Sequence, residues 1–203
     1  LRLRSIFPLS PQPETTHSSP RPFVLWHGLG DSYSSPGTTQ LASLIEDIHP
    51  RIFIHSIYID EVQDNDRKAC FYSNVNAQIE LVSDQLRGIS ELSGGFDAIG
   101  VSQGGQFLRA YVEQYNPSVN NLITFGAQHM GISVIPICSA WDLLCRVARR
   151  ATRSAVYCTW AQENIAQYFR DPNNFPMYPS SNHFLAAINN EFPPDVQYRN
   201  QTY

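Results

Sequence analysis

One short segment constrains the fold of this chain more than any other. Residues 96–101 (FDAIGV) form an apolar run typical of a buried strand, and residues 103–115 carry apolar side chains at helical spacing. Ser102 stands between them, within a G-x-S-x-G pattern at residues 100–104. Small residues around a serine permit the strained strand-to-helix turn that lifts the hydroxyl above a sheet, at the positive end of the following helix. A plain glycine-rich turn is the alternative, but the flanking strand and helix favour a nucleophilic Ser102.

The chain up to residue 128 repeats this alternation of strand and helix. Apolar or β-branched runs predict strands, and apolar residues at spacings of three and four predict helices. The expected strands are residues 22–27, 51–59 and 121–128, and the expected helices are residues 37–48 and 71–89. Repeated alternation of this kind predicts an α/β fold with a mostly parallel sheet flanked by helices.

Domain boundaries follow from proline content and from weakening periodicity. Residues 1–21 are broken by prolines and predict a disordered or processed N-terminal tail. Residues 22–203 predict one partial domain, in which the region 130–195 forms a helical cap with expected helices at 155–169 and 183–190. No strand is expected after the cap, so we expect the C-terminal strands of the sheet to be missing from this sequence.

A second loop offers the backbone donors that a nucleophilic serine requires for its oxyanion. The residue after the nucleophile, Gln103, supplies one N–H group. The loop from His27 to Asp31 follows the first expected strand directly, and its glycines let the N–H of Leu29 turn inward. A dinucleotide-binding loop is the alternative, but Tyr33 stands where the pattern G-x-G-x-x-G requires a third glycine.

Charge and hydropathy argue against several classes of function. The net charge is -4 and only 16% of residues are charged, so we expect no basic face for nucleic acid. No window approaches the roughly 18 apolar residues of a transmembrane helix. The histidines and cysteines have no metal-ligand spacing, and neither a metal nor a cofactor is expected.

Cysteine spacing and one sequon point to an oxidising compartment. The four cysteines, none in a C-x-x-C pattern, are Cys70, Cys138, Cys145 and Cys158. Cys138 and Cys145 bracket a short loop, and a disulfide there would stabilise the fold by about 2–3 kcal/mol in the chain-entropy model. The sequence Asn200-Gln201-Thr202 is a glycosylation acceptor. The alternative is four reduced cysteines in a cytosolic protein.

Four blocks of the sequence resemble one known family. They are VLWHGLGDS, NVNAQ, GVSQGGQFLRA and LITFGAQHMG. In order and spacing they are similar to palmitoyl-protein thioesterases of the lysosomal type, over roughly residues 23–203. The resemblance implies the α/β-hydrolase fold and hydrolysis of long-chain fatty acyl (palmitoyl) thioesters from S-acylated cysteines of proteins or peptides. It also implies a location in the lysosome or vacuole, or secretion.

The resemblance further implies roles for individual residues. The implied site consists of the nucleophile Ser102, the oxyanion-hole residues Leu29 and Gln103, and Gln128 close to the reacting carbonyl. The implied modifications are a cap disulfide between Cys138 and Cys145 and a glycan on Asn200. Whether Cys70 and Cys158 pair with each other is left open.

The sequence does not provide a convincing catalytic base. In this fold the acid and the histidine follow the serine along the chain. Only His129 and His183 follow Ser102, and we expect structural or hydrogen-bonding roles for both. Three later acids, Asp142, Asp171 and Asp195, are expected to be surface or helix-capping residues. The triad Asp and His are therefore expected downstream of Tyr203. Two alternatives stay open: a lipase or carboxylesterase of the same fold, and a non-catalytic acyl-binding fragment.

Overall fold

Four parallel strands form the sheet of this protein. The computed structural model describes residues 19–133, 167–172 and 177–191. The strands are β1 (Phe23–Trp26), β2 (Ile54–Ser56), β3 (Phe96–Val101) and β4 (Val119–Phe125), in the spatial order β2-β1-β3-β4. Trp26 lies opposite Gly100, and Val101 lies opposite Phe125, so the carboxyl ends of β1, β3 and β4 meet at one edge. The predicted parallel sheet is confirmed, although β2 is shorter than the strand expected over residues 51–59.

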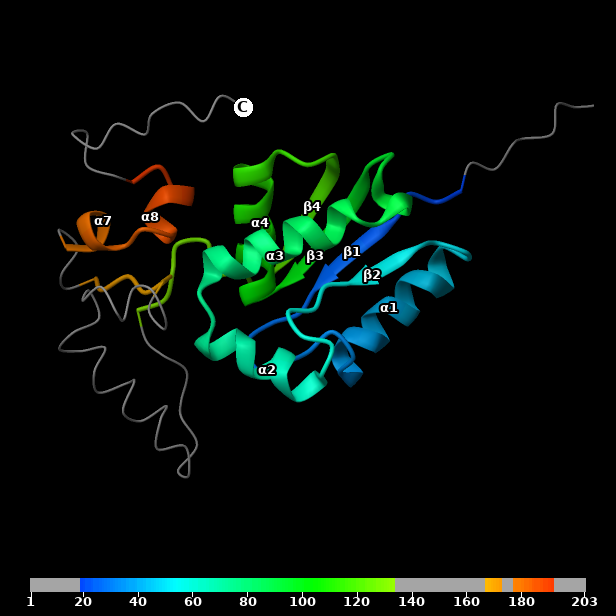
Figure 1. Ribbon diagram of the computed structural model, residues 1–203, viewed down its shortest axis with the longest axis horizontal. Helices are drawn as coiled ribbons and strands as arrows, with labels where there is room; N and C mark the ends of the chain where they lie inside the picture. The colour runs from blue at the N-terminus through cyan, green and yellow to red at the C-terminus, as the bar shows by residue number, and fades with distance from the viewer. Residues whose placement is uncertain (1–18, 134–166, 173–176, 192–203) are drawn as a thin grey trace, which may run out of the picture.

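Helices cover both faces of the sheet (Figure 1). The helical elements are α1 (Pro36–Ile48), α2 (Gln63–Tyr72), α3 (Val75–Arg87), the 3-10 helix η1 (Ser90–Leu92), α4 (Gln103–Tyr115), α7 (Met177–Ser181) and α8 (Leu185–Ile188). Successive strand residues point to opposite faces. Val24 and Ala98 therefore join the larger core with α3 and α4, while Leu25 and Ile99 join a smaller cluster under α1.

The single helix expected over residues 71–89 is wrong, because the structure has two helices there. The helical conformation is interrupted at Ser73 and Asn74. The Asn74 side chain accepts a hydrogen bond from the Ala77 N–H (3.2 Å) and caps α3. Phe71 belongs to α2 and is 44% exposed. The apolar spacing continues across the break, so periodicity did not reveal it. The break gives the fold a separate helix, α2, which lies beside the loop after β1.

The chain segment that we call the cap segment comprises residues 167–172 and 177–191. It packs against α4, where the Arg109 guanidinium donates to the carbonyl of Ile188 and to Oδ1 of Asn189. The expected helix 183–190 is confirmed in shorter form as α8, and α7 was not predicted. Most of the expected helix 155–169 lies outside the described residues. Its last three residues are not helical, and Phe169 forms a parallel bridge with Ile132.

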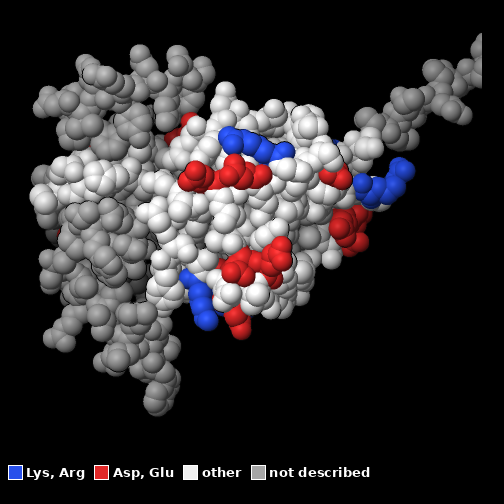
Figure 2. Space-filling view, viewed as in Figure 1, with Lys and Arg blue, Asp and Glu red and all other residues white. Residues whose placement is uncertain are grey.

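The described surface bears no continuous basic patch on the face viewed in Figure 2, where Lys and Arg side chains stand apart from one another. Three apolar side chains of β3 and β4 are exposed: Val101 (37%), Ile123 (38%) and Phe125 (55%). Within residues 19–133, 167–172 and 177–191, no helix has the length and apolar character needed to cross a membrane.

Several predicted features lie outside the described residues. They are most of the N-terminal tail, the cap residues Cys138, Cys145 and Cys158, the acids Asp142 and Asp195, and the sequon at Asn200. The predicted disulfide and glycan therefore stay predictions.

Candidate active site

Ser102 lies at the tip of a strained turn between β3 and α4. Its φ of 51° and ψ of -118° are a combination that residues with a Cβ rarely adopt. Neighbouring glycines make the turn possible, because a Cβ on Gly104 would lie 2.4 Å from the carbonyl oxygen of His27, and one on Gly100 would lie 2.3 Å from the Cα of Gly105. The N–H of Ser102 donates to the Phe125 carbonyl of β4 (2.7 Å). The sheet and the helix thus hold this serine at the carboxyl edge.

The loop after β1 packs directly against this serine. A Cβ on Gly28 would lie 3.2 Å from the Cβ and 3.9 Å from the Oγ of Ser102. The loop closes with a hydrogen bond from the Asp31 N–H to the Gly28 carbonyl (3.1 Å), and Gly30 takes a positive φ of 77° within it. Glycine favours that conformation because it has no Cβ. The loop therefore places the Leu29 backbone beside the serine.

Two backbone N–H groups at this point are available as donors. Gln103 is the first residue of α4, so no earlier turn of the helix can accept from its N–H. The N–H groups of Leu29 and Gln103 have no acceptor among the residues that the structure describes. This arrangement can stabilise negative charge on an oxygen bonded beside Ser102.

A buried ion pair between His27 and Asp66 stabilises the loop after β1. Nε2 of His27 lies 3.1 Å from Oδ2 of Asp66, and the two side chains are 1% and 0% exposed. The contact is an ion pair rather than a well-directed hydrogen bond. Asp66 also accepts from the N–H groups of Tyr33 (2.9 Å) and Ile59 (2.7 Å). The carboxylate of α2 therefore joins the loop after β1 to the segment after β2.

The ion pair shifts the pKa of both partners. Burial alone would lower the pKa of His27, but the Asp66 carboxylate, with help from the Cys70 sulfur and the Gly28 carbonyl, raises it to about 10. Burial would raise the pKa of Asp66, but His27 and the two backbone donors lower it below its usual value. His27 is therefore protonated at neutral pH and serves the structure of the loop.

Cys70 is a free thiol in the same region, buried and 8% exposed. Its Sγ lies 3.8 Å from Nδ1 of His27 and 3.7 Å from the Asp31 carbonyl. Cys70 carries no disulfide to any described residue. Cys158 lies outside the described residues, so the question of its pairing with Cys70 stays open.

The side chain of Gln103 connects the turn to two other elements. Its Nε2 donates to the Cys70 carbonyl of α2 (2.9 Å) and to the hydroxyl of Tyr168 in the cap segment (3.0 Å). The residue is 3% exposed. Both amide hydrogens of Gln103 are therefore used within the protein.

Gln128 and His129 follow β4 at the same edge of the sheet. The backbone carbonyl of Gln128 accepts from Nε2 of Gln106 (3.0 Å). The side-chain Oε1 of Gln128 is buried and has no hydrogen-bond partner among the described residues. Nε2 of His129 lies 3.0 Å from Oγ1 of Thr124, and burial together with the Arg109 charge lowers the pKa of this imidazole. His129 thus has the hydrogen-bonding role that the sequence favoured.

The described residues do not supply a general base to Ser102. The Oγ of Ser102 has no hydrogen-bond partner within residues 19–133, 167–172 and 177–191, and the exposed His183 lies between α7 and α8. No group of three or more His, Cys, Asp or Glu residues in this part of the chain could hold a metal ion. The chemistry visible here is a serine with preformed backbone donors.

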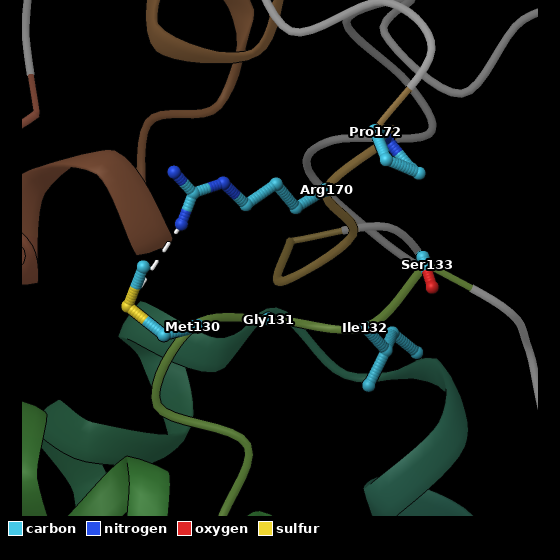
Figure 3. A pocket seen from close by; sticks show the side chains of 6 residues that line it. All are labelled: Met130, Gly131, Ile132, Ser133, Arg170 and Pro172. Carbon is cyan, nitrogen blue, oxygen red and sulfur yellow. Dashed lines mark hydrogen bonds between the residues drawn. The ribbon is translucent and has the colours of Figure 1, made fainter.

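Pocket size does not identify this site. A pocket of about 450 Å³ lies between the segment after β4 and the cap segment (Figure 3). It is lined by Met130, Gly131, Ile132, Ser133, Arg170 and Pro172. A smaller one of about 180 Å³ lies beside the loop and is lined by residues that include Gly28, Thr38 and Val101. Ser102 lines neither pocket. The candidate active site is therefore identified by the turn at Ser102 and the loop after β1, and not by a pocket.

Local sequence carried no signal for the roles of Asp66 and Tyr168 near this site. Asp66 follows the exposed Asp64 in the same short helix, and nothing in the local sequence separates the buried acid from the exposed one. Tyr168 was placed in an expected helix, where it looked like any aromatic core residue.

Comparisons with known proteins agree with the fold. The lipase BlEst2 of Bacillus licheniformis, solved in its mature form, matches with a TM-score of 0.50 at 16% identity, over 88% of this chain and 61% of that one. This likeness shows the α/β-hydrolase fold. Palmitoyl-protein thioesterase 1 of Caenorhabditis elegans is 35% identical over 174 residues, which cover 84% of this chain and 58% of the relative.

Two further relatives carry similar names. A palmitoyl-protein thioesterase-dolichyl pyrophosphate phosphatase fusion of Schizosaccharomyces pombe is 33% identical over 88% of this chain and 29% of its own length. Palmitoyl-protein thioesterase 3 of Dictyostelium discoideum is 30% identical over 92% of this chain and 60% of its own length. The chain thus spans less than two thirds of each of these relatives. The model of the palmitoyl protein thioesterase family matches residues 22–203, and this chain therefore belongs to that family.

Proposed function

We propose that this protein is a serine thioesterase that removes long-chain fatty acyl groups, palmitoyl among them, from S-acylated cysteines of proteins or peptides. The observation that carries the proposal is the close approach of the loop after β1 to the strained Ser102, since a Cβ on Gly28 would lie 3.2 Å from the Cβ of Ser102. The N–H groups of Leu29 and Gln103 have no acceptor among the described residues. Family membership supports the thioester substrate class.

The proposed reaction is acyl transfer through an acyl-enzyme. Ser102 Oγ attacks the thioester carbonyl carbon and gives its proton to a general base. The N–H groups of Leu29 and Gln103 receive the negative charge that develops on the carbonyl oxygen. The carbon–sulfur bond breaks, the sulfur leaves as the cysteine thiol with the proton from the base, and water then hydrolyses the Ser102 ester to a free fatty acid.

The proposed general base is a histidine with an acidic partner, both outside the described residues. A serine hydroxyl needs such a base at neutral pH. The proposal therefore concerns the complete protein. Gln128 is proposed to lie near the reacting carbonyl, in keeping with its position at the carboxyl edge of the sheet.

The test is hydrolysis of a palmitoylated peptide thioester by the complete protein, beside a matched oxygen ester. We expect thioester cleavage that Ser102→Ala abolishes and that Ser93→Ala, at an exposed serine of another turn, leaves unchanged. Preference for the oxygen ester would indicate a lipase or carboxylesterase. Acyl binding without turnover would indicate a binding protein. Either result contradicts the proposal.

The proposed location is the lysosome or vacuole, or the extracellular space. The support is the short spacing of Cys138 and Cys145, the sequon at Asn200 and the family itself. Mass spectrometry of the protein from its native source should find the Cys138–Cys145 disulfide and a glycan on Asn200. Free thiols and an unmodified Asn200 would contradict this location.

A further inference from the structure

The side chain of Gln103 has two fixed attachments, and one of them belongs to the cap segment. Its Nε2 carries two hydrogens, of which one goes to the Cys70 carbonyl (2.9 Å) and the other to the Tyr168 hydroxyl (3.0 Å). The same residue holds one of the two backbone donors beside Ser102. Movement of this side chain would therefore be transmitted to the donor, since both belong to the first residue of α4.

The backbone on both sides of Tyr168 is held in place. The Tyr168 carbonyl accepts from the Ile132 N–H (2.9 Å), and the Arg170 N–H donates to the Ile132 carbonyl (2.8 Å). On the other side, Oε1 of Gln167 accepts from the Val75 N–H at the start of α3 (2.7 Å). These bonds join the cap segment to the segment after β4 and to α3.

Buried polar contacts also order the rest of the cap segment around this point. Nδ2 of Asn182 donates to the Gln167 carbonyl (2.9 Å), while its Oδ1 accepts from the N–H of Leu185 (2.6 Å), the first residue of α8. The Tyr168 ring packs at an edge-on angle against Phe107, with the centroids 6.3 Å apart. The hydroxyl of Tyr168 is therefore directed at Gln103 by packing and by backbone bonds together.

The chemistry of the hydroxyl suits this contact. Burial raises the pKa of Tyr168 to about 12, so the group is neutral over the physiological range and accepts the amide hydrogen without bringing a charge to the site. A buried donor that loses its acceptor is destabilised or moves to find another.

We propose that Tyr168 is a positioning residue for the oxyanion hole, acting through the side chain of Gln103, so that docking of the cap segment fixes a donor used on Ser102. The inference rests on the proposed function of Ser102 and Gln103. It goes further by assigning a role to Tyr168, a residue of the cap segment whose link to the proposed oxyanion hole is its hydrogen bond with the Gln103 side chain.

The first test compares two tyrosine variants of the complete protein. Tyr168→Phe removes the acceptor and keeps the ring against Phe107, and we expect kcat for the palmitoyl thioester to fall about tenfold while KM stays within about twofold. The fall is smaller than the 10²–10³-fold that follows removal of an oxyanion donor, because the donor is displaced rather than deleted. Tyr178→Phe is the matched control, since it removes a buried hydroxyl bonded to Glu191 in the same segment (2.8 Å). It should leave kcat unchanged.

A double-mutant cycle separates positioning from general loss of structure. Gln103→Met keeps the backbone N–H and removes the amide, so Tyr168→Phe should have no additional effect on kcat in that background. Additive effects of the two substitutions, or a kcat of Tyr168→Phe equal to that of the wild type, would overturn the inference.

A readout independent of the thioester keeps the two proposals distinguishable. The rate of covalent labelling of Ser102 by a fluorophosphonate should fall in Tyr168→Phe and not in Tyr178→Phe. Normal labelling without thioester turnover would reject the proposed substrate class alone. Equal labelling rates in wild type and Tyr168→Phe would reject the role of Tyr168 alone, and a wild type that is not labelled would contradict both.

Discussion

His27 and Asp66 lie 3.1 Å apart, with both side chains almost completely buried, although one follows β1 and the other belongs to α2. The pair supports the loop that carries Leu29. Because the two charges are removed from water, each depends on the other for compensation. Loss of one partner should therefore affect the stability of the fold and the geometry beside Ser102 together.

Replacement of Asp66 by Asn should destabilise the protein by about 3 kcal/mol, since it leaves a buried imidazolium without its counter-charge. Urea unfolding of the complete protein measures the change. The matched control is Asp64→Asn in the same helix, where the carboxylate is 78% exposed and pairs with Arg67 at the surface. Its effect should stay within about 0.5 kcal/mol. Equal effects of the two substitutions would show that the buried pair does not stabilise the loop.

The contribution of this pair should depend on pH in a defined direction. The pKa of His27 in the folded protein is raised to about 10, so its contribution is complete below its ordinary pKa of 6.5 and is lost as the pH rises toward 10. The pKa of Asp66 is lowered, so its contribution is complete above its ordinary value of 3.8 and is lost at lower pH.

The difference in unfolding free energy between wild type and Asp66→Asn should therefore be largest from about pH 4 to pH 6.5 and should shrink toward pH 10. Unfolding curves at several pH values measure it, and the other titrating groups cancel in the difference. A difference that grows between pH 7 and pH 10 would contradict the assignment of a protonated His27.

Gly28→Ala should reduce the rate of acyl transfer by about tenfold or more, because small displacements at a reacting centre have large effects on rate. The added Cβ would lie 3.2 Å from the Cβ of Ser102 and 3.3 Å from the Val101 carbonyl, so the loop has to shift. The measurement is kcat for the thioester or the labelling rate of Ser102. Gly94→Ala is the control, since nothing lies within 4 Å of its added Cβ. An unaffected Gly28→Ala enzyme would show that the loop does not contribute a donor.

Ser102→Gly should be more stable than Ser102→Ala by about 1–2 kcal/mol, although both lack the proposed nucleophile. The backbone of residue 102 has a φ of 51° and a ψ of -118°, which glycine adopts without the steric penalty that a Cβ brings. Thermal or urea unfolding of the two variants gives the comparison. If Ser102→Gly proves equal or less stable, the turn stores no strain at this position.

Local sequence was sufficient to predict the strand-to-helix turn at Ser102. The strand over residues 96–101 and the helix over residues 103–115 occur with the predicted bounds. Their patterns involve neighbours in the chain: an apolar run, small residues that allow a close turn, and apolar side chains one helical turn apart. The same type of evidence failed at residues 71–89, because an N-cap at Asn74 divides a periodic stretch without changing its phase.

The contacts that complete the candidate site join residues far apart in the sequence. The Gln103–Tyr168 bond spans 65 positions, and the segment containing Tyr168 carried no pattern that distinguished it from a core helix. Asp66 and Asp64 have almost the same local surroundings in sequence, yet only Asp66 meets His27.

The sequence by itself determined the parallel α/β alternation, the strained serine at residue 102 and the glycine loop that follows β1, because each depends on short-range backbone preferences. Tertiary structure alone decided that His27 of this loop pairs with Asp66 of α2, and that the side chain of Gln103, the first residue of α4, donates a hydrogen bond to Tyr168. These partners are selected by how helices and strands pack, and packing brings together side chains whose local sequences contain no information about each other.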